Sequence, residues 1–528
     1  MNKIHVLDCT LRDGGYCNHW KFGAENIKKI VNGLTEANID VIECGYISDK
    51  VVSDKDSTRY SSIHTMNRIL PPDKNGKLYV AMINYGECNI ESLPEHQTLG
   101  VDGIRVAFHK KDAENAIVFC RQVMQKGYKV FVQPMVSIGY TDNEFLSLIK
   151  EVNKISPYAF YIVDSFGTLK KKNLIRMFYM VEHNLQREIW IGFHSHNNMQ
   201  LAYANAQCLV DVQTSRSLLI DTSVYGMGRG AGNLNTELFV EYLNEYADGK
   251  YLIKPLLHMI DEVLNEFYKN NYWGYSLSKY LSASHNVHPN YASFFDDKNT
   301  LTAEAMDELL GQISLDRKFE FDISYAEELY HQYMAKRYFY DVHKDILKEK
   351  IQGKKVLLIA PGKSAEIDKD KILLFMERED VVSISINFEY ENTELIFISN
   401  LIRFRDLGAE KYKKCIVTSN ISIENAYAQV EYDALLAPIL SVRDNAGMMV
   451  IRLMIELGAE EILLAGFDGY SHFSEYNYSI GQRTFITKPE LADAMNKGIS
   501  QMLVQFKDEI SIKFITKSIY QEKYLEGN

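Results

Sequence analysis

Residues 4–226 contain eight short apolar runs rich in β-branched residues, spaced roughly 25 to 37 residues apart. Stretches with helical spacing of apolar residues, such as residues 25–38 and 113–127, lie between runs. Hydrophobic strands that alternate with amphipathic helices indicate parallel strands buried on both faces. We therefore predict an α/β fold with a (β/α)8 TIM barrel, and a doubly wound open sheet is the alternative. The predicted strands are residues 4–10, 41–46, 78–83, 103–108, 129–137, 159–167, 189–196 and 218–226.

The rest of the chain has a different pattern. Residues 241–350 have the spacing of successive helices without strands, which predicts a helical extension or linker. The α/β pattern returns at residues 354–367, with further strand candidates at 381–388, 395–400, 413–420 and 461–470. We predict a barrel over residues 1–240, a helical extension over 241–350 and a Rossmann-like α/β domain over 351–528.

Composition excludes several classes of function. The formal net charge of −12 argues against a nucleic-acid partner, because phosphate binding needs clustered Lys and Arg. No run approaches the ~18 consecutive apolar residues of a membrane span. The N-terminus lacks the layout of a signal peptide, and the seven cysteines are scattered without CxxC spacing. We therefore expect reduced thiols and a cytoplasmic location.

Polar side chains gather at the ends of the predicted barrel strands, where the active sites of such barrels lie. They are Arg12 and Asp13 after the first strand, Glu43 near the end of the second, Asp164 and Ser165 at the sixth, and His194 and His196 at the seventh.

A metal site is the interpretation that best explains the two histidines. His194 and His196 are two residues apart, so on a strand both side chains point to the same face. Asp13 ends a nearby strand of a closed barrel and supplies a carboxylate. Two nitrogens and one carboxylate oxygen suit Mn²⁺, Co²⁺ or Mg²⁺. The alternative is a pair of solvent-facing loop histidines and an unrelated aspartate.

Arg12 precedes the candidate metal ligand Asp13. A guanidinium beside a metal can bind a carboxylate or stabilise an enolate oxygen, while the metal polarises a carbonyl group. This combination suits chemistry through the enolate of a 2-oxo acid. An Arg12–Asp13 ion pair that only caps the strand is the alternative, and it leaves the histidines unexplained.

The glycine-dense stretch "GMGRGAGN", residues 226–233, has two interpretations of equal weight. It is either a weak phosphate-binding loop, which does not match the Walker pattern, or a tight turn that brings backbone to the metal site. In the second interpretation Asn233 serves as a helix cap or as a fourth oxygen ligand.

The motifs "LDCTLRDGG", "HSHNN" and "GMGRGAGNLNTE" resemble those of the DRE-TIM metallolyase (HMGL-like) superfamily, in particular its 4-hydroxy-2-oxovalerate aldolase branch. This resemblance implies a TIM barrel and one divalent metal, most often Mn²⁺, held by Asp13, His194 and His196. It also implies that Arg12 stabilises a pyruvate enolate and that Ser165 contacts the pyruvate carboxylate. We add Glu43 and Asn233 as candidate substrate-binding residues.

One position departs from the pattern of the aldolases. They have a histidine three residues after the metal-binding aspartate, which handles the proton of the substrate hydroxyl, and Tyr16 occupies this position here. A phenol with a pKa near 10 is a weaker base than imidazole at neutral pH. Either Tyr16 acts near the metal, or His19 takes this role from the same loop. The identity of the aldehyde therefore stays open.

The C-terminal part contains a second candidate site. Gly362 and Ser364 lie between a predicted strand and helix, the typical position of an anion site. Residues 384–390 and 443–470 resemble parts of the sialyltransferase and DUF115 families. This resemblance implies a nucleotide or nucleotide-sugar site near Gly362, Ser364, Asn387 and Asp468. A purely structural α/β domain is the alternative.

Together these features predict a carbon–carbon lyase (an aldehyde-lyase) that acts on a small 2-oxo acid and an aldehyde. The fusion of two α/β domains suggests a place in the assembly of an unusual sugar or surface glycan. The alternatives are a transferase, with acyl-CoA condensation at the barrel or glycosyl or nucleotidyl transfer at the C-terminal domain, and a catalytically silent scaffold. The helical middle could be a dimer surface, so a homo-oligomer stays open.

Overall fold

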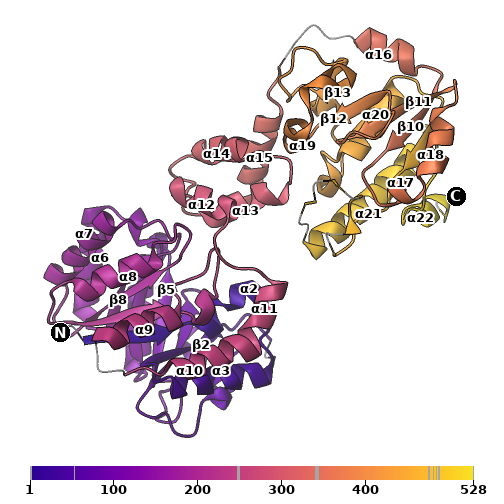
Figure 1. The fold of residues 1–528 in the computed structure, drawn as a ribbon. Coiled ribbons are helices and arrows are strands. Elements are labelled where there is room, and N and C mark those ends of the chain that lie inside the picture. Colours follow the sequence, from indigo (N-terminus) through magenta and orange to yellow (C-terminus); the bar gives the residue numbers. More distant parts are fainter. Residues whose placement is uncertain are drawn as a thin grey trace. The chain divides into compact units, whose positions relative to one another are not determined.

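The computed structural model describes residues 3–52, 54–246, 250–338, 344–473, 476–479, 481–482, 484–485 and 488–526. The chain forms two compact units (Figure 1). The first comprises residues 1–293 and 310–321, and the second comprises residues 294–309 and 322–528. The three-part division with boundaries near 240 and 350 stays a prediction. Across the described residues, no helix combines the length and the apolar character needed to cross a bilayer.

Eight parallel strands form a closed barrel in the first unit, which confirms the predicted TIM barrel. β1 pairs with both β9 and β2, and this double pairing closes the sheet on itself. A two-residue strand, β3 (Arg59–Tyr60), pairs in parallel with the last two residues of β2. The barrel strands are β1 (Lys3–Asp8), β2 (Val41–Ile47), β4 (Leu78–Asn84), β5 (Gly103–Phe108), β6 (Lys129–Pro134), β7 (Ala159–Asp164), β8 (Trp190–Ser195) and β9 (Ser217–Thr222).

Helices cover the outside of the barrel. Most strands are followed by a helix of at least ten residues, but β2 and β4 are followed by short helical turns only. The helices are α3 (Ala24–Glu36), α4 (Ile63–Met66), α5 (Ala113–Gln125), α6 (Asp142–Ile155), α7 (Lys171–Asn184), α8 (Ala202–Asp211) and α9 (Thr236–Tyr246). Two further helices, α10 (Ile253–Met259) and α11 (Asn265–Asn270), follow α9, and α10 packs against α3 (Figure 1).

Side chains along each strand point alternately to the outside and the inside of the barrel, and this produces two apolar layers. In β5, Ile104 and Val106 face the helices and join the large core between the barrel wall and its helical cover. A smaller cluster, which includes Leu7, Val80 and Phe131, fills the inside of the barrel. Arg105 also points inward and is fully buried, so the centre of this barrel is charged as well as apolar.

The first strand is shorter than predicted. It ends at Asp8, and the next residues form a one-turn helix, α1 (Thr10–Asp13), followed by α2 (Gly15–Asn18). Arg12 and Asp13 therefore lie on a helical turn above the barrel and not on the strand itself. The backbone N–H of Asp13 donates to Cys9 O at 2.8 Å, which fixes this turn.

The helices after the barrel include α12 (Leu277–Ser284), α13 (Pro289–Asp297), α14 (Ala303–Gly311), α15 (Ile323–Met334) and α16 (Lys344–Ile351). Near the end of this predicted helical segment, α15 ends at Met334 and α16 begins at Lys344. Residues 339–343 lie outside the described residues.

The second unit contains a seven-stranded parallel sheet in the order β14-β13-β12-β11-β10-β15-β16, which confirms the predicted second α/β domain. The strands are β10 (Lys355–Ile359), β11 (Val381–Ile386), β12 (Leu395–Ile398), β13 (Cys415–Thr418), β14 (Ala428–Val430), β15 (Glu461–Ala465) and β16 (Ser511–Phe514). Their helices are α17 (Ser364–Ile367), α18 (Lys369–Met376), α19 (Leu401–Asp406), α20 (Ala446–Glu456), α21 (Pro489–Phe506) and α22 (Gln521–Glu526). The short strands β14 and β16 were not among the predicted strands.

Candidate active site

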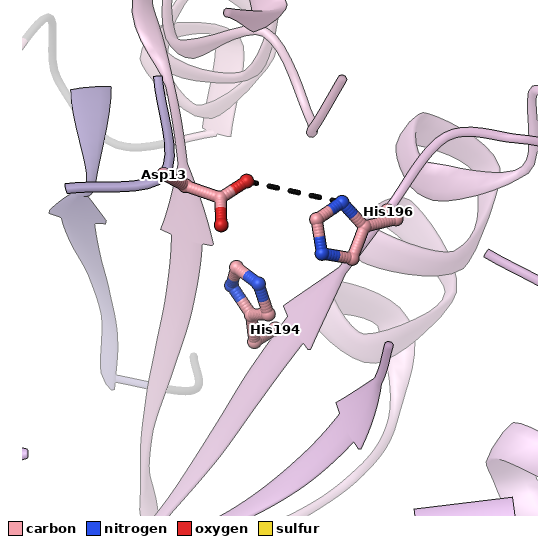
Figure 2. Close-up of side chains that lie close together, drawn as sticks. All are labelled: Asp13, His194 and His196. Carbon is pink, nitrogen blue, oxygen red and sulfur yellow. Dashed lines mark ion pairs between the residues drawn. The ribbon is translucent and has the colours of Figure 1, made fainter. Parts of the chain in front are cut away.

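Asp13, His194 and His196 converge at the carboxyl ends of the barrel strands (Figure 2). All three side chains are buried, and each offers one ligand atom within 4.8 Å of the others. Asp13 comes from α1, His194 from β8, and His196 follows the end of β8. The two imidazole rings meet edge to face at 5.2 Å between centroids. This donor set fits a divalent cation such as Mn²⁺, Co²⁺ or Mg²⁺.

A carboxylate behind His194 sets the orientation of its ring. Asp221 at the end of β9 lies 3.0 Å from Nδ1 of His194, so this nitrogen carries the proton and donates it. Nε2 of His194 is then left with its lone pair for a metal ion. Arg105 in turn forms an ion pair with Asp221, and Tyr161 donates a hydrogen bond to the other oxygen at 2.9 Å.

His196 has a free ligand atom. Its Nδ1 is buried, has no hydrogen-bond partner among the described residues and lies 3.8 Å from Oδ2 of Asp13 (Figure 2). Burial lowers the pKa of His196 to about 4, so its imidazole is neutral, which is the form that binds metals. Burial alone would raise the pKa of Asp13, but Arg12 and the two histidines hold it well below its usual range.

Arg12 is held rigidly beside this cluster. Its Nε donates to Oε2 of Glu43 at 2.8 Å, and its Nη1 donates to Oδ1 of Asp13 at 2.5 Å. Its Nη2 is buried without a hydrogen-bond partner among the described residues. Glu43 also accepts from Arg105 at 2.6 Å. Because it binds both Arg12 and Arg105 from the middle of β2, Glu43 positions the two guanidinium groups. The pKa of Arg12 stays well above its usual value because Glu43 and Asp13 outweigh the effect of burial.

The glycine-dense loop is a tight turn against Asp13. Gly226, Gly230 and Gly232 have φ values of +62°, +69° and +83°, which favour glycine. A Cβ at Gly228 would lie 2.6 Å from Oδ2 of Asp13, so only glycine permits this approach.

Asn233 closes the same loop over Asp13. Its Nδ2 donates to Oδ2 of Asp13 at 2.7 Å, while its Oδ1 is buried and has no hydrogen-bond partner in the described part of the chain. Asn233 does not cap α9, because that helix begins at Thr236. Of the two interpretations of the loop, the geometry favours the turn at the metal site.

A cavity of about 440 Å³ opens above the cluster. Its volume is within the range of sites for small molecules. Its lining mixes aromatic, basic and acidic side chains. The lining residues are Arg12, Asp13, Tyr16, Tyr46, Lys50, Met82, Asn84, Tyr85, Gly86, Glu87, Ala107, Phe108, His109, Asp112, Gln133, Met135, Val136, Val163, Ser165, Phe166, His194, His196, Arg229, His288 and Phe319.

The cavity lining shows which of the other predicted site residues can contact a bound substrate. Tyr16 lines it, with its hydroxyl 3.4 Å from that of Tyr46. His19 is exposed and is not among the lining residues. Ser165 lines the cavity, and its Oγ accepts from Val136 N at 2.9 Å, which leaves the hydroxyl proton to donate. Asp164 is not among the lining residues, and backbone N–H groups of Thr168 and Leu169 bind its carboxylate.

The predicted anion site of the second unit is filled by the protein itself. The backbone N–H of Ser364 donates to Asp468 at 2.8 Å, and the Ser364 hydroxyl also donates to this carboxylate. A Cβ at Gly362 would lie 2.3 Å from Gly466 O, so close strand packing explains this glycine. Asn387 accepts from Ser399 N at 3.1 Å. The four residues surround the switch point of the sheet, and each has a structural partner.

Several residues of the site were missed from the sequence. Arg105 gave a signal, since a charged residue in the middle of an apolar strand needs a buried partner. Asp221, near the end of its strand, gave a weaker one. Arg229 and His288 gave none, because their meeting in the cavity depends on how the chain after the barrel returns to it.

With this geometry described, the chain can be compared with known proteins. Residues 100–256, which include His194, His196 and Asn233, match the family model described as HMGL-like. The 4-hydroxy-2-oxovalerate aldolase of Geobacillus genomosp. 3 is 27% identical over 243 residues, which cover 46% of this chain and 70% of that protein. The oxaloacetate decarboxylase of Mycobacterium tuberculosis is 25% identical over 243 residues, which cover 45% of this chain and 69% of that protein.

A solved structure is also similar to the chain. It is the N-terminal domain of a protein from Bacteroides vulgatus that is provisionally described as an aldolase. The two are 29% identical, with a TM-score of 0.49, and the match covers 55% of this chain and 96% of the other. The resemblance of the second unit to sialyltransferases and DUF115 proteins stays a prediction.

Proposed function

We propose that the barrel is a class II aldolase or lyase that forms or cleaves a carbon–carbon bond beside a 2-oxo acid, through a pyruvate-type enolate. The observation that carries this proposal is the buried convergence of Asp13, His194 and His196 next to Arg12. The HMGL-like match and the aldolase and decarboxylase relatives support it.

The metal ligands are Asp13, His194 and His196, and Mn²⁺ is the ion we propose among those that suit them. When bound, the cation polarises the carbonyl group of the 2-oxo acid as a Lewis acid. Asp221 keeps His194 in the tautomer that presents Nε2.

Arg12 is the residue that stabilises the enolate oxygen. Glu43 and Asp13 fix two of its nitrogens, and Nη2 is left as a buried donor that no described residue binds. A fixed donor aimed at developing negative charge lowers the barrier because it needs no reorganisation during the reaction. Ser165, with its free hydroxyl proton, is suited to donate to the carboxylate of the same substrate.

Tyr16 is the proposed carrier of the proton on the hydroxyl group of the aldol. It lines the cavity and contacts the buried Tyr46, whereas His19 lies outside the lining. In condensation Tyr16 donates this proton to the aldehyde oxygen, and in cleavage it accepts it.

Proton exchange tests the enolate without knowledge of the aldehyde. The full-length protein is incubated with pyruvate and Mn²⁺ in D₂O, and the pyruvate methyl signal is followed by NMR. We expect the signal to disappear with the wild type. With EDTA or with Asp13→Asn, the rate of proton exchange should be lower by at least about 100-fold. Asp211→Asn, an exposed aspartate at the end of α8, is the matched control. An unchanged methyl signal with metal shown to be bound would overturn the proposal.

Oxaloacetate is a second substrate for the same test. Its decarboxylation produces a pyruvate enolate and CO₂. Turnover that depends on Asp13 would therefore support the enolate site and its ability to cleave a carbon–carbon bond. Loss of oxaloacetate at the same rate with Asp13→Asn would show that the reaction does not use this site.

For the second unit, we propose only a part in assembling an unusual sugar or surface glycan, on the basis of the fusion of two α/β units. Titration of the full-length protein with UDP and with CMP, followed by calorimetry, tests for a nucleotide site. Saturable heat that disappears with Asn387→Ala would support it. No heat at millimolar nucleotide would contradict it.

A further inference from the structure

Arg229 is one of the residues that line the cavity. It belongs to the glycine-dense loop, and its backbone N–H donates to Asp13 at 3.3 Å. Its guanidinium lies 5.5 Å from the centroid of the Tyr16 ring and donates to Oδ1 of Asn290 at 3.0 Å. Within the described ranges no carboxylate forms an ion pair with this side chain. A guanidinium in a ligand cavity without a counter-ion is suited to bind an anion.

The contact between Arg229 and His288 points to the same conclusion. The backbone N–H of Asn290 lies 3.2 Å from Nδ1 of His288, and Nη2 of Arg229, which can only donate, lies 3.0 Å from Nε2. A donor therefore faces each ring nitrogen, whereas a neutral imidazole has only one lone pair to accept with. An oxygen atom with negative charge beside Arg229 and His288 would supply the acceptor that this group lacks.

The ring of His288 stays neutral and fixed in place. Burial, together with the charge of Arg229, lowers its pKa to about 3. Phe166 meets the ring edge to face at 5.5 Å, and Phe321 stacks against it at 6.1 Å. Packing therefore holds the ring edge that carries Nε2 next to Arg229.

The other charges along the cavity nearly balance, so Arg229 decides the sign on this side. Lys50 is a basic lining residue and Glu87 and Asp112 are acidic ones, while burial lowers the pKa of His109 and favours its neutral form. Glu87 lies 3.7 Å from Arg59, which offsets its charge. Asp13 is already bound by Arg12 and Asn233.

We propose that Arg229 and His288 form a subsite for an oxyanion group, a carboxylate or a phosphate, carried by the aldehyde partner. This inference rests on the proposed function, because it names the class of the second substrate. In condensation, the methyl carbon of pyruvate loses a proton and forms a bond with the aldehyde carbon, and the aldehyde oxygen takes up a proton. Cleavage is the reverse, and the oxyanion group does not react.

Matched pairs of aldehydes test the subsite in turnover. Butanal is compared with 4-oxobutanoate, and glyceraldehyde with glyceraldehyde 3-phosphate, each with pyruvate and Mn²⁺. We expect kcat/KM of the wild type to favour at least one anionic member by about 10- to 100-fold. Arg229→Met should reduce that ratio to near one, and Arg229→Lys should keep part of it. The exposed Arg187, changed to Met, is the matched control and should leave the ratio as it is.

The two pairs separate the sources of the charge. A preference confined to 4-oxobutanoate assigns a carboxylate, and one confined to glyceraldehyde 3-phosphate assigns a phosphate. Equal rates within both pairs, in a wild type that exchanges the pyruvate methyl protons, would overturn the subsite and leave the proposed function intact.

Binding tests the subsite when turnover is absent. Succinate and inorganic phosphate are titrated separately into the full-length wild type, Arg229→Met and Arg187→Met, after each variant is shown to melt at the wild-type temperature. We expect one of the two probes to bind Arg229→Met at least tenfold more weakly, with Arg187→Met unaffected. Equal binding to all three proteins would overturn the subsite, whatever the result of pyruvate exchange.

Discussion

At the scale of single residues, the barrel centre is a chain of alternating charges. Arg105 is fully buried and binds both Glu43 and Asp221. Glu43 holds Arg12, and Asp221 holds His194. The group proposed to stabilise the enolate and one proposed metal ligand are thus positioned from the same guanidinium. Such a network is costly to break, because each unpaired member would be a buried charge.

Asp221→Asn should weaken metal binding. The amide keeps the size of the carboxylate but loses the charge that fixes the Nδ1–H tautomer of His194. We expect the Kd for Mn²⁺, measured by calorimetry, to rise by about 10- to 100-fold. Asp211→Asn is the control, and an Asp221→Asn protein that binds Mn²⁺ within twofold of the wild type would contradict this role.

Gly228→Ala should disturb the same centre from the other side. The new Cβ would lie 2.1 Å from Nδ2 of Asn233 and 2.6 Å from Oδ2 of Asp13, so these side chains must move. We expect Mn²⁺ affinity to fall by at least about tenfold, since ligand geometry is lost. Gly311→Ala is the control because its Cβ would meet nothing closer than 3.4 Å. Unchanged affinity in Gly228→Ala would show that the loop does not support Asp13.

At the scale of elements, the end of β1 is tied to the start of α9. Asp8 is the last residue of β1, and its carboxylate accepts hydrogen bonds from the Thr236 hydroxyl at 2.6 Å and from Thr10 N at 2.9 Å. Burial outweighs these bonds and raises the pKa of Asp8 to about 6. The folded state therefore prefers the protonated form of this carboxyl.

This raised pKa predicts how the stability of the first unit depends on pH. The contribution of Asp8 is fully present below its unfolded pKa of 3.8 and is lost as pH rises through about 6. The difference in unfolding free energy between wild type and Asp8→Asn should fall by about 2 kcal/mol between pH 4 and pH 7.

Urea titrations followed by tryptophan fluorescence measure this difference, because Trp20, Trp190 and Trp273 all lie in the first unit. The corresponding difference between wild type and Asp211→Asn should stay flat over the same range. A flat difference for Asp8→Asn as well would show that the carboxyl is not protonated in the folded state.

At the scale of the whole molecule, the chain leaves the first unit and returns to it. Residues 294–309 belong to the second unit, whereas residues 310–321 belong to the first. Phe319, on the returning segment, lines the cavity, so the site needs residues well beyond the barrel strands.

Metal should stabilise the first unit alone. Binding to the folded state stabilises by about 2.7 kcal/mol at a free concentration of 100 times Kd. In calorimetric scans, we expect Mn²⁺ to shift the transition that tryptophan fluorescence also reports, and to leave a second transition in place. EDTA and Asp13→Asn should abolish the shift. A single transition that moves as a whole would contradict two independently unfolding units.

Much of this architecture was predictable from local patterns. The spacing of apolar runs predicts the barrel, since parallel strands buried on both faces need continuous hydrophobic segments and covering helices. The meeting of Asp13 with His194 and His196 follows as well, because the carboxyl ends of all barrel strands share one end. The predicted extent of the first strand was wrong, since the turn after Asp8 is helical.

The sequence by itself thus determined the strand order of the barrel and the meeting of Asp13, His194 and His196 at its carboxyl end, because both depend on periodicity and on position along a strand. Only the tertiary structure decided that Asp468 fills the helix start at Ser364, and that Arg105 joins Glu43 to Asp221. It also decided that Arg229 contacts His288 in the cavity lining. These are contacts between side chains distant in sequence, and their geometry depends on how the whole chain packs, which no local pattern records.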